Sequence, residues 1–156
     1  MSPKLVTLEP MRIVGFEVRT SVREEMAPHT AKIIKLWDRF KKEQVRERIC
    51  GENPTCPPVA LFSKYESDYN GKFSLLAGVV AQGDDVPEGM TSVTTEGGQY
   101  LLFSGSGPMP KVWFSVWQGV TEYFSKKPQY KRAYTTDFEI YPAADKLDIH
   151  ISVQPL

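Results

Sequence analysis

Two helical patterns occupy matching places in the two halves of the sequence, and this order of elements restricts the possible folds most. Pro28 can open the first helix, and residues 30–49 carry apolar side chains at helical spacing, at Ile33, Trp37 and Phe40. Prolines 108 and 110 open the second helix, whose apolar stripe runs over residues 113–124. Two β-rich segments stand before and after each helix. The predicted order is therefore strand–strand–helix–strand–strand, repeated once.

The segments around the helices have the properties of antiparallel strands. The Asn70-Gly71 pair is a strong hairpin signal, because both residues tolerate positive φ. In the last segment apolar residues alternate with polar ones, which is typical of a strand with one solvated face. The predicted strands are 5–9, 12–19, 59–66, 73–81, 91–96, 99–104, 137–141 and 147–154.

These elements predict an α+β fold. We expect duplicated β-α-β-β modules to form an antiparallel sheet of about eight strands, with two main helices. The length of 156 residues predicts a single domain over 1–156, with half-repeats of about 1–85 and 86–156. A half that cannot bury its own sheet face would pack on its copy, and the pseudo-twofold groove between them would suit a small molecule.

Charge and hydropathy exclude several classes of protein. The 19 Lys and Arg residues balance 19 Asp and Glu residues, so neither direct nucleic-acid binding nor attachment to an anionic membrane is expected. No apolar run is long enough to span a bilayer. The beginning of the chain lacks the apolar core of a signal peptide, and we therefore expect a cytoplasmic protein.

Signatures of metal, nucleotide and nucleophile sites are missing from the sequence. Two histidines cannot complete a convincing Cys/His metal site. Cys50 and Cys56 are six residues apart, which permits a disulfide, but a reducing compartment favours free thiols. Gly105-Ser106-Gly107 is followed by a proline and so departs from a phosphate loop. We expect no cofactor and no metal, and we assign no catalytic residue.

The chain is rich in aromatic residues, which make up 12% of it. Together with the duplicated order, several motifs resemble those of the GyrI-like small-molecule-binding domain, also called the AraC-type effector-binding domain. They are Leu36-Trp37-x-x-Phe40, Tyr65-Glu66-Ser67-Asp68-Tyr69-x-Gly71, Val86-Pro87-Glu88-Gly89-Met90, Gly97-Gly98-Gln99-Tyr100, Gly107-Pro108, the Trp117 helix and Asp137-Phe138-Glu139-x-Tyr141.

The resemblance implies an aromatic-lined pocket for bulky, lipophilic, cationic compounds. Most relatives carry a DNA-binding domain beside this one, but 156 residues leave no room for it, so we expect a stand-alone member. The resemblance also implies a glutamate anchor on the strand after the second helix, which is Glu139 here. A buried carboxylate favours a cation over a neutral ligand, and aromatic rings add cation–π attraction. The candidate ligand-binding residues are Glu139, Trp37, Tyr65, Tyr100, Phe103, Trp113, Trp117 and Tyr141.

Simpler interpretations of the same residues stay open. Trp37 and Trp117 lie on apolar helix stripes and could serve the core alone. Glu139 could face water. Glu66 occupies the related position in the first half, where we expect a surface or hairpin residue.

Three functions compete. The first is a binder of lipophilic cations, acting as an effector-binding or sequestering protein. The second is a hydrolase of electrophilic small molecules, with the pocket glutamate as general base. The third is a protein-interaction or inhibitor module. The expected partner is a small lipophilic cation, and the chain would be a monomer or a homodimer.

Overall fold

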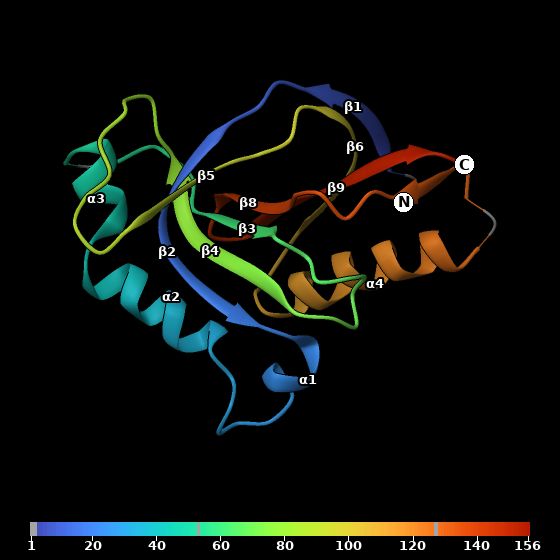
Figure 1. Cartoon of the computed structure of the whole chain (residues 1–156), viewed down its shortest axis with the longest axis horizontal. Helices are drawn as coiled ribbons and strands as arrows, with labels where there is room; N and C mark the ends of the chain where they lie inside the picture. Colours follow the sequence, from blue (N-terminus) through green and yellow to red (C-terminus); the bar gives the residue numbers. More distant parts are fainter. Residues whose placement is uncertain (1–2, 53, 127) are drawn as a thin grey trace.

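The computed structural model describes residues 3–52, 54–126 and 128–156, so the first two residues of the predicted domain lie outside the described part. Its centre is a nine-stranded antiparallel sheet (Figure 1). Eight strands follow the order β1-β6-β9-β8-β3-β4-β2-β5, and β7 pairs with β9. The strands are β1 (Lys4–Leu8), β2 (Arg12–Thr20), β3 (Val59–Ser63), β4 (Phe73–Val80), β5 (Thr91–Thr94), β6 (Gly98–Ser106), β7 (Tyr130–Arg132), β8 (Asp137–Ala143) and β9 (Lys146–Pro155).

The strand order is symmetric about the pairing of β3 with β8. On either side of this pair, β4 corresponds to β9, β2 to β6 and β5 to β1. The leading strand of each half pairs with the other half, because β1 pairs with β6 and β5 pairs with β2. The α+β class and the antiparallel sheet are confirmed. The exchange of edge strands supports one domain with half-repeats 1–85 and 86–156, and these boundaries stay a prediction.

The helices are α1 (Val22–Glu25), α2 (Ile33–Lys42), α3 (Val45–Cys50) and α4 (Lys111–Ser125). The prediction of one helix over 30–49 is wrong, because Gln44 adopts a left-handed backbone conformation (φ 51°) that separates α2 from α3. Pro28 precedes the helix instead of opening it. The carboxylate of Glu25, in α1, accepts hydrogen bonds from the backbone N–H groups of Lys32 and Ile33 and thereby caps α2.

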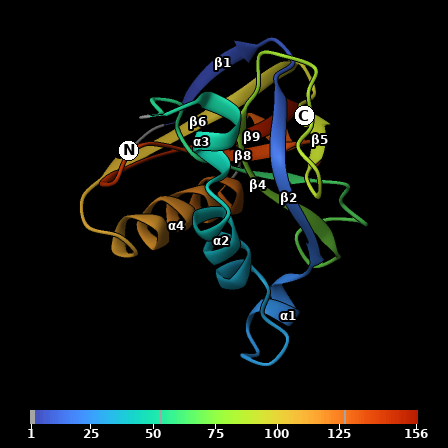
Figure 2. The same cartoon turned by 90° about the vertical axis from the view of Figure 1, so that its left-hand side faces the viewer.

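Helices α2 and α4 lie on the same side of the sheet (Figures 1 and 2). Helices α2 and α3 pack on β2, β3 and β4, around Phe16, Phe40 and Leu75. Helix α4 packs on β6 and β9 through Val112, Val116 and Val120. The opposite face of the sheet carries a third apolar cluster, formed by Ile13, Val59, Leu61, Leu76, Tyr100 and Phe138. No helix within the described residues is long and apolar enough to cross a membrane.

The two cysteines form a disulfide, so the expectation of free thiols is wrong. Cys50 ends α3, and the loop that leads to β3 carries Cys56 back beside it, with the two Cα atoms 6.6 Å apart. The Arg46 guanidinium donates hydrogen bonds to the carbonyls of Pro54 (3.1 Å) and Cys56 (2.9 Å). These bonds hold the loop against α3 and bring the two sulfur atoms together.

Candidate ligand-binding site

A cavity of about 340 Å³ lies between α2 and α4, above the middle strands of the sheet. Its size is within the range of small-molecule pockets, which is roughly 300–1,000 Å³. Side chains from both halves of the chain line it. They are Ile33, Ile34, Trp37, Ala60, Phe62, Leu75, Met109, Pro110, Trp113, Glu139 and Tyr141.

The carboxylate of Glu139 lies at this cavity and is 3% exposed. Oε2 accepts hydrogen bonds from the indole N–H groups of Trp113 (2.9 Å) and Trp117 (2.7 Å), and Oε1 accepts one from the Tyr141 hydroxyl (2.6 Å). Among the described residues, no Lys, Arg or His nitrogen lies within 4.0 Å of this carboxylate. Glu139 is therefore a buried acid whose hydrogen-bond partners here are neutral.

Local geometry brings these four side chains together. Trp113 and Trp117 are four residues apart in α4 and so share one helix face. Glu139 and Tyr141 alternate in β8 and share one sheet face, and the pairing of Glu139 with Ala60 of β3 centres the carboxylate in the sheet.

Burial controls the protonation of the site. Desolvation raises the pKa of Glu139, while the hydrogen bonds from Tyr141, Trp117 and Trp113 act in the opposite direction. The pKa of Tyr141 is also raised, first by desolvation and then by the charge of Glu139. Tyr141 therefore remains a hydrogen-bond donor to Glu139 at neutral pH.

Five of the eight predicted ligand-binding residues lie at this cavity or bond to its carboxylate. Trp37, Trp113, Glu139 and Tyr141 line the cavity, and Trp117 joins them through its bond to Glu139. Trp37 comes from α2 and contacts the Tyr141 ring edge-on, with 6.1 Å between ring centroids. Helix α4 thus contacts the Glu139 carboxylate directly, whereas helix α2 is connected to it through Tyr141.

The other three predicted residues lie outside the cavity, which corrects the expectation of a single site. Tyr65 donates a hydrogen bond to the carboxylate of Asp137. Tyr100 belongs to the cluster on the opposite sheet face, and its hydroxyl donates to the Glu96 carbonyl (2.6 Å). Phe103 lies three residues after Tyr100 in β6, so its side chain is on the opposite face of the sheet and packs against α4. It is on the far side of that helix from Glu139.

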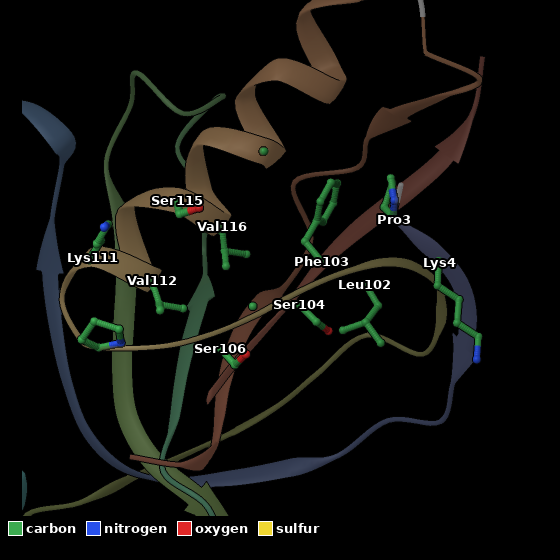
Figure 3. Close-up of a pocket in the computed structure, with 13 residues that line it drawn as sticks. Pro3, Lys4, Leu102, Phe103, Ser104, Ser106, Lys111, Val112, Ser115 and Val116 are labelled. Carbon is green, nitrogen blue, oxygen red and sulfur yellow. The ribbon is translucent and has the colours of Figure 1, made fainter. Parts of the chain in front are cut away.

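Phe103 borders a larger cavity of about 640 Å³ between α4, β6 and the start of β1. Figure 3 shows its lining, with Val116 of α4 between Val112 and Phe103 and with Lys4 and Lys111 at opposite ends. No carboxylate borders this cavity within the described part of the chain, and its aromatic lining is Phe103 alone. It is therefore less suited to a lipophilic cation than the cavity at Glu139.

Sequence reasoning missed several residues of the site. Ile34, Met109 and Pro110 border the cavity, although none of them was predicted to bind the ligand. It also missed Asp137, which is fully buried and carries the same alternation signal as Glu139. Glu66, matched by sequence to Glu139, lies exposed beyond the end of β3, as expected of a hairpin residue.

A family model described as "Cass2: Integron-associated effector binding protein" matches residues 4–153. The chain belongs to the Cass2 family. The match covers nearly the whole sequence and confirms the resemblance to effector-binding domains.

Individual relatives agree with this assignment. The Vibrio cholerae integron cassette protein VCH_CASS2 has a crystal structure that is similar over 98% of this chain and 96% of its own, with 32% identity and a TM-score of 0.84. YobU of Bacillus subtilis (strain 168), a candidate transcriptional regulator, is 24% identical over 94% of each chain. The structure of SAV2435 bound to tetraphenylphosphonium covers 99% of this chain and 94% of its own, with 20% identity and a TM-score of 0.78.

Proposed function

We propose that this chain binds bulky, lipophilic cations in the cavity between α2 and α4, with Glu139 as the electrostatic anchor. The observation that carries the proposal is a carboxylate that is 3% exposed and bonded to two indoles and a phenol. A cation that enters the cavity meets a charge that water reaches poorly, so their attraction is weakly screened.

The aromatic residues around Glu139 fit the same ligand class. Trp37 and Trp113 border the cavity from opposite helices, and ring faces attract cations by about 0.5–2 kcal/mol, depending on desolvation. Stacking makes few demands on ligand shape, which favours a binder of several related compounds. The fold relative SAV2435 has been seen with tetraphenylphosphonium, a cation of this class.

The test compares tetraphenylphosphonium with the neutral, similarly bulky triphenylphosphine oxide by titration calorimetry. We expect the wild-type protein to prefer the cation, and we expect Glu139→Gln to lose about 10-fold or more of the affinity for the cation alone, since a desolvated charge contact is removed. Gln can keep the hydrogen bonds, because its carbonyl accepts from the indoles and its NH₂ group can donate to the Tyr141 oxygen.

Glu66→Gln is the matched control, because this glutamate is exposed and outside the cavity, and it should leave both affinities unchanged. Equal affinity of wild type and Glu139→Gln for the cation would contradict the proposal. The same variants test the hydrolase alternative with an electrophilic ester. If the wild type hydrolyses the ester, and Glu139→Gln binds it but does not hydrolyse it, the protein is an enzyme and not only a binder.

A further inference from the structure

A second cavity adjoins the one at Glu139. It has a volume of about 360 Å³ and is lined by Trp37, Phe40, Lys41, Pro58, Tyr141 and Ala144. Trp37 and Tyr141 line both cavities, and they are the residues that the two linings share. Their rings meet edge-on at an interplanar angle of 82°. The Trp37–Tyr141 pair therefore stands between the two cavities.

The two members of this pair are held differently. The Tyr141 hydroxyl donates to Glu139 (2.6 Å) and its backbone N–H donates to the Pro58 carbonyl (3.1 Å). Among the described residues, no hydrogen-bond partner is found for the Trp37 indole. Trp37 is therefore the side chain that can turn and join the cavities for a longer ligand.

Counting the residues that the structure describes, each cavity has one charged side chain in its lining, and the two charges are opposite. Glu139 is the charged residue of the first lining and Lys41 that of the second. Lys41 is exposed, and it makes no ion pair with any carboxylate of the described residues. Its ammonium group is therefore available to a ligand, and its flexible stem can follow the ligand's position.

We propose that the joined cleft favours a lipophilic cation that carries an anionic group on a side arm, with the cation beside Glu139 and the anion beside Lys41. Lys41 is then a residue that determines specificity: it attracts the acidic arm and repels a second positive charge. This inference rests on the proposed function, because it requires that the cation occupy the Glu139 cavity first.

The experiment uses two probes that differ only in the arm, carboxybutyl-triphenylphosphonium and its methyl ester. At neutral pH the first is a zwitterion and the second a simple cation. Because Lys41 is exposed, we expect a modest effect: wild type should prefer the acid over the ester by about two- to five-fold, as measured by calorimetry at low salt. Lys41→Gln should remove that preference.

Lys42→Gln is the matched control, since Lys42 is the next residue in α2, is also exposed and borders neither cavity. It should keep the wild-type preference. The ratio of two affinities within one variant cancels any change in folding stability. An unchanged ratio in Lys41→Gln, or no preference in wild type, overturns the role of Lys41. Ester binding that is absent or insensitive to Glu139→Gln overturns the proposed function as well.

Discussion

Asp137 and Glu139 stand two residues apart on the same face of β8, and both are buried, at 0% and 3% exposure. Their partners differ. Asp137 forms an ion pair with Arg132 (2.8 Å), whereas the hydrogen bonds to Glu139 come from two indoles and a phenol. Asp137 has its charge neutralised within the fold. Within the described part of the chain Glu139 has hydrogen bonds without a countercharge, and under our proposal this difference separates a structural acid from a ligand-binding one.

Asp137 has an ion-pair partner because the short strand β7 supplies Arg132. β7 pairs with β9 and presents Arg132 beside Asp137, with the guanidinium also stacked over the Tyr134 ring at 4.4 Å. The backbone N–H and the hydroxyl of Ser152 on β9 donate to the same carboxylate. Glu139 lies one pleat further along, beneath α4, where indole N–H groups take the place of a cation.

The largest expected effect comes from breaking the paired acid. Asp137→Asn leaves the largely buried Arg132 without its countercharge, and we expect the free energy of unfolding to fall by about 3 kcal/mol, as measured by urea denaturation. In a double-mutant cycle with Arg132→Gln, the combined loss should be smaller than the sum of the single losses. Strict additivity of the two losses would show that the ion pair is not what distinguishes Asp137.

Glu139, which has no ion-pair partner within the described ranges, should show the opposite effect of charge on stability. Desolvation raises the pKa of Glu139 above its ordinary value of 4.5, so the folded protein binds this proton more tightly than the unfolded chain. The contribution of Glu139 to stability is therefore complete below pH 4.5 and is lost as the pH rises through the raised pKa. The loss amounts to about 1.4 kcal/mol for each pH unit between the ordinary and the raised pKa.

Glu139→Gln removes this titration, so wild type should lose stability relative to the variant as the pH rises from acid to neutral. Denaturant melts at several pH values measure the difference between the two proteins. His150 titrates in the reverse sense, because desolvation lowers its pKa to about 4, but it is present in both proteins and cancels. A wild type that gains stability over Glu139→Gln with rising pH would contradict the assignment of an uncompensated buried charge.

The sequence predicts which helices and strands form better than it predicts where each of them begins and ends. Alternation and helical stripes are local signals, and they identify the strands around Phe73 and Ile149 and the helix around Trp117. The break at Gln44 and the cap that Glu25 provides for α2 depend on contacts between separate elements, which no local pattern records. The three-residue strand β7 is too short to carry a periodic signal.

The residues of the site likewise separate into those that local patterns predict and those that depend on contacts between distant elements. Trp113 with Trp117 and Glu139 with Tyr141 are pairs at helix and strand spacing, so local periodicity groups each pair correctly. Local periodicity could not show that Tyr100 and Phe103 lie outside the Glu139 cavity. The position of β6 relative to that cavity depends on the order of strands in the whole sheet. The disulfide likewise depends on how the loop after α3 folds back.

The most direct measurement is a crystal structure of the protein with tetraphenylarsonium, whose arsenic atom is located by its anomalous scattering. We expect an anomalous peak in the cavity between α2 and α4, within about 6 Å of the Glu139 carboxylate, and a weaker peak there in Glu139→Gln at the same ligand concentration. A peak in the cavity outside α4, beside Phe103 and Lys111, would contradict the claim that Glu139 anchors the ligand.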